Sequence, residues 1–252
     1  MSNLVKSLAV LIASVIVVHL AYIGFIRPQA DLVSEAARLA GQSAPRNIFV
    51  ILKDYEQEIC IILMLWAGYL IVSKSMEILK DRYLFTVDLL EDSEENGADL
   101  ETVLSNLEAL PAENSETPLV VSLMASLRRY LITSDVQNTS DAVESSIEAL
   151  AIRQEAGNSM VRYLIWAIPS IGFIGTVRGI GGALALADQA LAGDISGMTN
   201  QLGLAFNSTL VALLISIVLM FLLHQLQQLQ DGLVVDTQAY CEKFLLKRIS
   251  KR

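Results

Sequence analysis

Polar side chains lie inside two apolar segments of this sequence, at positions where lipid would leave them without partners. Thr176 lies in one segment, and Asn207, Ser208 and Thr209 follow one another in the next. Such groups are costly in hydrocarbon unless they meet a polar partner or water. Hydroxyl groups can order water and relay protons, or replace part of the hydration shell of an ion. These residues therefore predict a narrow ion pathway; in the alternative interpretation, Thr176 bonds the carbonyl group four residues earlier in its own helix.

Small residues recur along one face of each of these segments. Gly172, Gly175, Gly179 and Gly182 are spaced 3, 4 and 3 residues apart, which places them on one side of a helix. The second segment has its own face of small residues, which consists of Ala205, Ser208, Ala212 and Ser216. In a membrane, small residues at this spacing let helix backbones approach closely. Both faces therefore predict helix packing, and together with the hydroxyl groups they predict the walls of a narrow passage.

Arg178 lies near the middle of the first of these segments. Arginines inside membrane segments are rare, and each is a candidate functional residue. In one interpretation the side chain extends to the membrane surface or pairs with a carbonyl group or a lipid phosphate; in the other it contacts a neighbouring subunit or an acid of a partner protein. Neither segment carries an acid at its middle. If protons pass here, the titrating carboxylate is therefore expected to come from another chain.

Four apolar segments decide the class of protein. Of the 252 residues, 53% are hydrophobic, and the mean hydropathy is +0.49. A membrane helix needs roughly 20 apolar residues, and the sequence predicts membrane helices at residues 1–26, 59–73, 160–186 and 202–223. The first could be a signal peptide, but its apolar run is longer than such peptides carry and no A-x-A site follows it. We expect a retained anchor and an all-α integral membrane protein with four transmembrane helices.

The basic residues predict the orientation of these helices, because bases in short loops mark the cytoplasmic side. The C-terminal segment is rich in lysine and arginine, whereas the loop 187–201 has neither. We therefore expect a multi-pass protein of the bacterial cytoplasmic (inner) membrane with both termini in the cytoplasm. The bases of the first outer segment run against this rule. The remaining segments are expected as a periplasmic segment 27–58, a cytoplasmic helical domain 74–159, a periplasmic loop 187–201 and a cytoplasmic C-terminal helix 224–252.

Apolar periodicity predicts long helical extensions in the cytoplasm. Helices are expected at 74–90, 98–110 and 119–132, with a loop at 111–118 and a further helix that begins at Asp141 and runs into the third membrane helix. Gly232 is a possible kink in the C-terminal helix. The sequence shows no strand pattern and no internal repeat.

Charge and cysteine content exclude several classes of function. Seven acids from Asp88 to Glu101 follow one another without a base between them, which predicts a solvated face rather than a partner site. No basic stripe indicates nucleic-acid binding. Cys60 and Cys241 are expected near opposite membrane faces, so a disulfide is not expected, and their spacing suits no metal. No catalytic triad, metal cluster or phosphate loop is present, so neither an enzyme nor a cofactor is expected.

Two stretches resemble a known family. "AIPSIGFIGTVRGIGGAL" (residues 167–184) resembles the proline-to-glycine pattern of the MotA/TolQ/ExbB proton-channel family, and "FNSTLVALLISI" (residues 206–217) resembles its threonine-bearing last span. The helix 59–73 with its cytoplasmic continuation fits the layout of the family more loosely. The N-terminal anchor lies outside the three-span core of the TolQ and ExbB type. The charged helix by which flagellar stators contact the rotor has no counterpart here, so a flagellar role is disfavoured.

The resemblance implies a rotary motor. Five copies of such a chain form a ring, a homopentamer, around two copies of a single-span partner of the ExbD, TolR or MotB type, each with an aspartate in its span. Thr176 and Thr209 would be the pore hydroxyl groups near that aspartate, and Pro169 and Gly175 would shape the third span. The hydroxyl group of Ser208 is a weak hint of sodium rather than proton transport, and Arg178 departs from the large apolar residue of the family. The resemblance thus implies work driven by an ion gradient.

Two other functions stay open on the sequence alone. A small-solute transporter is disfavoured because there are four spans, no inverted repeat and no broken helix. A membrane scaffold would use its acidic cytoplasmic domain to recruit partners, and its small-residue faces would serve packing alone. Co-purification with a single-span protein that carries a membrane aspartate would separate the motor from both alternatives.

Overall fold

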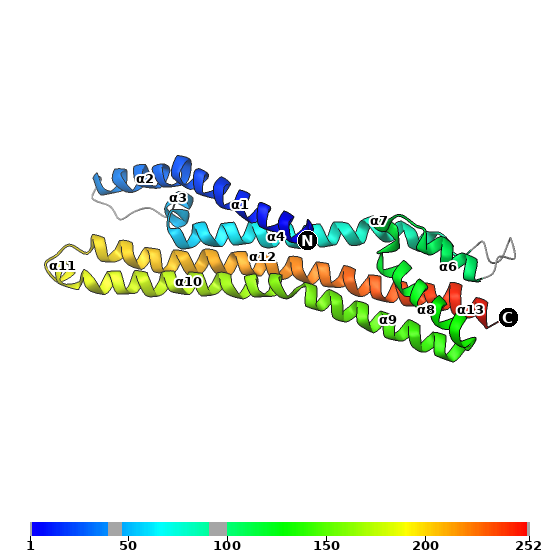
Figure 1. Ribbon diagram of the computed structural model, residues 1–252. Coiled ribbons are helices and arrows are strands. Elements are labelled where there is room, and N and C mark those ends of the chain that lie inside the picture. Colours follow the sequence, from blue (N-terminus) through cyan, green and yellow to red (C-terminus); the bar gives the residue numbers. More distant parts are fainter. Residues whose placement is uncertain (1, 40–46, 91–99, 251–252) are drawn as a thin grey trace. The chain divides into compact units, whose positions relative to one another are not determined.

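The computed structural model describes residues 2–39, 47–90 and 100–250, and every regular element in this part of the chain is helical (Figure 1). This confirms the all-α fold class. The first elements are α1 (Ser2–Ala21), the π-helical turn η1 (Tyr22–Ile26), α2 (Arg27–Leu39), α3 (Ile48–Leu52), α4 (Tyr55–Asp81) and the 3₁₀ turn η2 (Arg82–Thr86). They are followed by α6 (Leu100–Glu108), α7 (Ala112–Ser115), α8 (Pro118–Thr133), α9 (Val136–Gly157), α10 (Ser159–Ala185), α11 (Ala187–Leu191) and α12 (Ser196–Tyr240), and the chain continues through η3 (Cys241–Leu246) and α13 (Lys247–Ile249).

Four stretches of helix are long and apolar enough to cross a membrane. They are Leu4–Ala37, Tyr55–Thr86, Val136–Ala185 and Ser196–Ile249, and each overlaps one of the four predicted spans. Helix α4 begins at Tyr55, four residues before the predicted span, because Glu56, Gln57 and Glu58 form its first turn. These three residues are buried, so side chains assigned to the outer segment from sequence belong to the helix that crosses the membrane.

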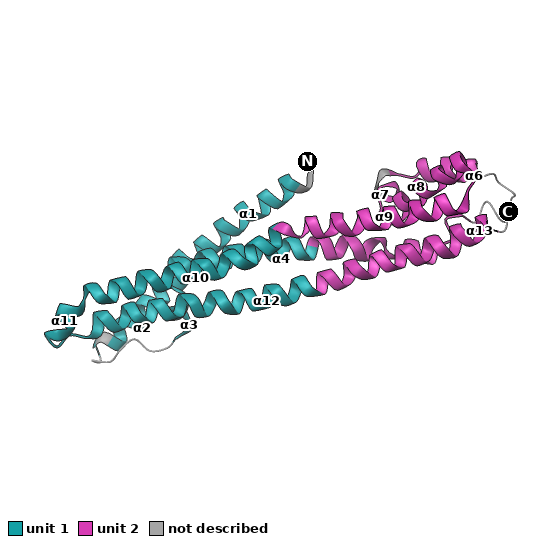
Figure 2. Ribbon diagram, turned by 90° about the horizontal axis from the view of Figure 1, so that it is seen from below, with its two compact units in different colours: residues 1–72, 160–224 teal, residues 73–159, 225–252 magenta. Residues whose placement is uncertain are grey.

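The chain forms two compact units (Figure 2). Unit 1 consists of residues 1–72 and 160–224, and unit 2 of residues 73–159 and 225–252. Unit 1 therefore holds most of the apolar helices, and unit 2 holds their polar continuations with α6 to α9. Helix α12 belongs to both units and is 45 residues long. It is helical through Gly232.

Unit 2 has an apolar core. Buried side chains from α6, α8, α9 and η3 meet in it, among them Leu107, Leu123, Val143 and Leu245. The helix expected at 98–110 is present as α6, and the one expected at 119–132 as α8. The predicted loop 111–118 contains the short helix α7. Residues 91–99, with most of the acidic run, lie outside the described part of the chain.

The start of α9 differs from its prediction. The helix begins at Val136, and the side chain of Asp135 accepts a hydrogen bond from the backbone N–H of Gln137 at 3.0 Å. This is the bond of a helix N-cap. Asp141 lies one turn further on and accepts a hydrogen bond from the Gln137 side chain at 3.1 Å. The prediction of a helix start at Asp141 was therefore wrong, because a pair of charged residues within the first turns imitates a cap in sequence.

Candidate functional site

The two faces of small residues pack against each other in unit 1. Helices α10 and α12 lie side by side (Figure 1) and run in opposite directions. A Cβ atom built on Gly172 would lie 2.5 Å from the Cβ of Ala212, and one built on Gly179 would lie 2.7 Å from the Cβ of Ala205. No side chain fits between the helices at these positions. The glycines therefore allow a close backbone approach within one chain, as expected for small residues in membrane helices.

The same packing surrounds Gly175 and Gly182. A Cβ atom on Gly175 would lie 2.6 Å from the Cβ of Ser208, and one on Gly182 would lie 2.8 Å from Oε1 of Gln201. At the other end of the interface the Ser216 hydroxyl group donates to the carbonyl oxygen of Ile165 at 3.2 Å. Helix α10 remains continuous through Pro169. The contact between the two helices is thus close and lined by small side chains over most of its length.

Thr176 and Thr209 meet in this contact. Their hydroxyl groups are hydrogen-bonded to each other. Thr176 Oγ1 is also 3.1 Å from the carbonyl oxygen of Ala205 on the opposite helix and 3.3 Å from that of Gly172, four residues back in its own helix. Thr209 Oγ1 is 3.1 Å from the same Gly172 oxygen. The bond of Thr176 within its helix and its bonds across the interface are therefore both available.

This arrangement allows more than one hydrogen-bond pattern. Each hydroxyl group has one proton to donate and can accept two more hydrogen bonds. Two hydroxyl protons face three acceptors, namely two carbonyl oxygens and the other hydroxyl group, so alternative hydrogen-bond patterns exist at nearly the same geometry. Both threonines are half-buried. The pair is thus open at one side to whatever lies beside the helix hairpin.

The other two polar residues of α12 behave differently. Ser208 is buried and its hydroxyl group donates within its own helix, 2.9 Å from the carbonyl oxygen of Leu204. Asn207 is half-buried, and its side chain forms no hydrogen bond with another described residue. The structure thus brings Thr176 and Thr209 together, places Ser208 one residue from them against Gly175, and leaves Asn207 aside.

Arg178 has a carboxylate partner in its own chain. Its Nη2 atom lies 2.8 Å from Oε2 of Glu56 in the first turn of α4. The side chain of Glu56 is 9% exposed, whereas that of Arg178 is 47% exposed. The contact predicted between Arg178 and another subunit or partner stays a prediction, and the exposed part of the guanidinium leaves room for it.

A second carboxylate in the same turn fixes the N-terminal helices. Glu58 is buried, and its two oxygens bind Nδ1 of His19 at 2.6 Å and Nη2 of Arg27 at 2.5 Å. The Arg27 guanidinium also lies over the ring of Tyr55, 4.4 Å from its centre. Further along, Trp66 Nε1 donates to the Ser7 hydroxyl group at 3.0 Å. Helix α1 is therefore docked along α4 by polar contacts at both ends.

Several buried polar atoms in the first half of the chain have no hydrogen-bond partner among the described residues. Tyr22 Oη, Asp54 Oδ2 and Gln57 Oε1 are among them. Burial raises the pKa of the Asp54 carboxyl group, against the opposing effect of the Lys53 and Arg178 charges. Buried polar atoms are normally satisfied, so each of these atoms is a candidate to bind an internal water molecule.

Sequence reasoning missed Glu56 and Glu58, although a signal was present. His19 and Arg178 are basic residues inside apolar segments, and basic groups in membranes pair with acids. Glu58 directly precedes the predicted span 59–73, and Glu56 lies two residues before Glu58. A search for partners of the two bases would have pointed to this turn.

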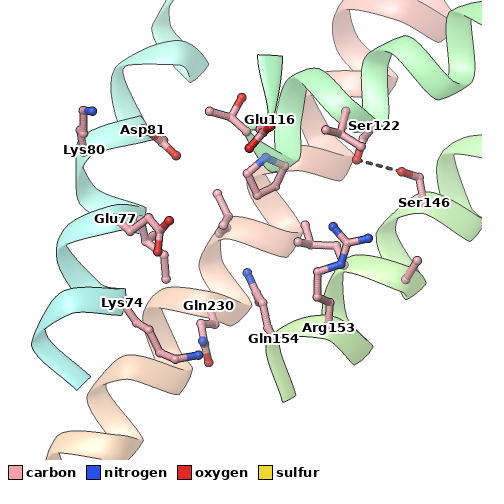
Figure 3. Close-up of a pocket in the computed structure, with 17 residues that line it drawn as sticks. Lys74, Glu77, Lys80, Asp81, Glu116, Ser122, Ser146, Arg153, Gln154 and Gln230 are labelled. Carbon is pink, nitrogen blue, oxygen red and sulfur yellow. Dashed lines mark hydrogen bonds between the residues drawn. The ribbon is translucent and has the colours of Figure 1, made fainter. Parts of the chain in front are cut away.

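Unit 2 contains a separate polar pocket of about 530 Å³ (Figure 3). Lys74, Lys80 and Arg153 line it together with Glu77, Asp81 and Glu116. Ser146 donates to Ser122 at 2.9 Å on its wall. The three bases and three acids balance, so the charge of the pocket selects neither an anion nor a cation.

The fold and the hydroxyl pair define an all-helical, multi-pass membrane protein with a polar contact between two apolar helices. Residues 114–239 match the family model of the MotA/TolQ/ExbB proton channel family. The match covers half of the chain, and the chain belongs to this family. It is therefore a membrane protein of a channel family, not of an enzyme family. No curated protein and no solved structure matches the chain.

Only one part of the site lies within the residues that match the family model. Thr176, Thr209 and Arg178 lie within the matched residues, whereas α1 to α4, with Glu56 and Glu58, precede them. The ion pair between Arg178 and Glu56 thus joins the family region to the N-terminal helices of this chain.

Proposed function

We propose that this chain is the ion-conducting ring subunit of a rotary motor that turns an ion gradient into mechanical work. The observation that carries the proposal is the hydroxyl contact of Thr176 with Thr209 between α10 and α12. In a family of proton channels, a half-buried pair of hydroxyl groups between two apolar helices is the group best suited to hand an ion or a proton to a neighbour. The translocated ion is a proton, or sodium in the alternative.

The ring is proposed as a homopentamer around two copies of a single-span partner of the ExbD, TolR or MotB type. Family membership supports partners of this type in general. The exposed apolar side chains of α10 and α12 supply surface for neighbours or lipid, among them Phe173, Val177, Phe206 and Leu213. The hydroxyl pair is half-buried in the single chain. A partner helix beside the hairpin would enclose it.

The chain is proposed to lie in the bacterial cytoplasmic membrane with both termini in the cytoplasm. Unit 2 would then be cytoplasmic and the loop around α11 periplasmic. The absence of bases from residues 187–201 supports this orientation. Two cysteine variants would test it: Ala192→Cys in the loop is expected to react with a membrane-impermeant thiol reagent in intact cells, and Arg129→Cys in α8 only after lysis.

A membrane scaffold or a small-solute transporter without motor activity remains the alternative. A scaffold has no need of hydroxyl groups bonded across its helix contact, which favours the ion pathway. The same polar pair could nevertheless stabilise the hairpin of a scaffold by about 0.6 kcal/mol, the mean for hydrogen bonds between membrane helices. Stability and ion flux must therefore be measured separately.

The testing experiment is purification of the chain from its native membrane in mild detergent, followed by native mass measurement and reconstitution into liposomes. We expect a complex with five copies of this chain and two of a single-span protein with an aspartate in its span. We also expect the liposomes to dissipate an imposed pH or sodium gradient. A complex without such a partner, or liposomes that hold both gradients, would contradict the motor.

A further inference from the structure

The carboxylate of Glu56 lies well below the outer end of unit 1. Its partner Arg178 is seven residues before the end of α10 at Ala185, which corresponds to about 10 Å along a helix at 1.5 Å per residue. Glu56 is therefore at the level of the hydroxyl pair rather than at the level of the connecting loop. An acid at this depth is a candidate for transport by default.

Glu56 packs against the residue that directly precedes Thr176. Its Cγ atom lies 3.1 Å from the position that a Cβ atom of Gly175 would occupy, and Gly175 directly precedes Thr176. Ser208, which directly precedes Thr209, lies against the same position. The missing side chain of Gly175 thus leaves the space in which the Glu56 side chain of α4 meets α10 and α12, one residue before each threonine.

Several buried polar atoms of unit 1 have no hydrogen-bond partner among the described residues. Asp54 precedes α4, and its Oδ2 atom is buried without a partner among the described residues. Gln57 is fully buried, and its Nε2 atom is held by the carbonyl oxygen of Ile51 while its Oε1 atom is left over. Tyr22 Oη is the third such atom. Buried groups of this kind are normally satisfied by internal water, and water in this region would connect Glu56 with the outside.

We propose that Glu56 takes up the cation at the outer end of the pathway and passes it to the hydroxyl pair of Thr176 and Thr209, with Arg178 as the counter-charge that the cation displaces. This inference rests on the proposed function. A proton from water forms an O–H bond with the Glu56 carboxylate and cancels its charge. That bond breaks again when the proton moves to the oxygen of a neighbouring water or hydroxyl group. A sodium ion would instead be bound by the carboxylate in place of the guanidinium.

Glu56 and Arg178 are buried to different extents, and this difference indicates which of the two side chains moves. Glu56 is 9% exposed and is held in the first turn of a long helix, whereas Arg178 is 47% exposed on a long side chain. The guanidinium can therefore leave the pair and keep contact with water or a neighbour, because charged heads of long side chains can extend to polar surroundings. The carboxylate cannot. Glu56 stays in place while Arg178 binds and releases it.

The test uses the complex purified from its native membrane and reconstituted into liposomes, with a pH-sensitive and a sodium-sensitive dye inside. Glu56→Gln keeps the shape of the side chain and removes its charge. Glu58→Gln is the matched control, because Glu58 is equally buried in the same turn but binds α1 and α2. The double variant Glu56→Gln/Arg178→Gln removes both charges, so that no buried charge is left without a partner. The dye that responds identifies the ion.

We expect Glu56→Gln and the double variant to lower ion flux about a hundredfold, the lower range for loss of a positioned proton-transfer group. Glu58→Gln is expected to conduct as the unchanged complex does. We further expect the double variant to match the unchanged complex in thermal stability. A double variant that conducts normally would overturn the proposal, because the ion pair would then serve packing alone.

A measurement on the unchanged complex tests the proposal even if the variants fail to assemble. A hydrophobic carbodiimide reacts with buried carboxyl groups, and peptide mass spectrometry locates the adduct. We expect modification of Glu56 in step with the loss of flux. Flux that survives full modification of Glu56 would overturn the proposal. Failure of the proposed function has a different outcome, since the unchanged complex would then conduct no ion.

Discussion

The hydroxyl group of Thr176 on α10 is hydrogen-bonded to that of Thr209 on α12, and both reach the carbonyl oxygen of Gly172. The two residues are 33 positions apart and belong to helices that run in opposite directions. This contact turns the tight packing of two glycine- and alanine-rich faces into a polar site. Packing and polarity are thus separate features, and variants can remove one without the other.

Thr209→Val is expected to abolish ion flux while the complex still assembles. Valine has nearly the shape of threonine but no hydroxyl group, so the relay loses a member and the helix contact keeps its volume. Thr209→Ser is the matched control, since it keeps the hydroxyl group and should retain most of the flux. Flux is measured in liposomes and assembly by native mass spectrometry. Equal flux in the valine and serine variants would remove Thr209 from the pathway.

Gly175→Leu is expected to separate α10 from α12 and to prevent normal assembly. Even a Cβ atom at this position meets Ser208, and overfilling a packed contact costs about 1–3 kcal/mol or more. Gly181→Ala is the control on the same helix, because nothing lies within 4 Å of a Cβ atom there. Thermal unfolding in detergent and native mass measurement report the effect. A stable, normal assembly of Gly175→Leu would show that the close approach is not required.

Much of this arrangement follows from local patterns in the sequence. The apolar lengths predict the four spans, and the spacing of Gly172, Gly175, Gly179 and Gly182 predicts a face that packs closely. These features are readable because each depends on residues within one helix. The structure adds which face meets which: the glycines of α10 pack on Ala205, Ser208 and Ala212 of α12 rather than on an unidentified neighbour.

The ion pair of Arg178 and Glu56 could not be predicted from such patterns. Arg178 and Glu56 are 122 positions apart, and no periodicity connects them. The first turn of α4 was assigned to an outer segment because its acids interrupt the hydropathy that marks a span. Burial of a charge depends on a partner from another helix, and single-helix patterns contain no information about such partners. The sequence therefore suggested lipid, a carbonyl group or another chain as the partner of Arg178, where the structure supplies Glu56 of the same chain.

Glu58→Ala is expected to loosen α1 and α2 from α4. The change removes the acceptor of both His19 and Arg27, and loss of one member of a buried ion pair costs about 3–5 kcal/mol. Hydrogen exchange of the purified complex should show faster exchange in residues 2–39 and unchanged protection in α10. Val15→Ala is the control, because this exposed side chain on α1 leaves the polar contacts intact. Unchanged exchange in residues 2–39 of Glu58→Ala would mean that other contacts hold the N-terminal helices.

Tyr240→Phe is expected to destabilise unit 2 without affecting ion flux directly. The Tyr240 hydroxyl group donates to the carbonyl oxygen of Val87 at 2.7 Å and accepts from the backbone N–H of Leu89 at 2.8 Å. Removing it leaves a backbone donor and acceptor without this partner, at a cost of about 1–3 kcal/mol. Tyr163→Phe is the control, since Tyr163 is exposed on α10. Thermal unfolding that is equal in the two variants would contradict a structural role of the Tyr240 hydroxyl group.

The start of α12 is expected to loosen in acid. The Asp194 carboxylate accepts hydrogen bonds from the backbone N–H of Ser196 at 3.1 Å and from its hydroxyl group at 2.6 Å. These bonds hold the pKa of Asp194 below its ordinary value of 3.8. A folded-state pKa below the unfolded value means that the unfolded state binds more protons, so the stabilisation is present above pH 3.8 and is lost as the pH falls below it. Hydrogen exchange in the first turn of α12 should therefore increase in that range relative to Asp194→Asn, whose amide oxygen accepts the same bonds without titrating. An identical pH dependence in both proteins would show that this carboxylate does not hold the start of the helix.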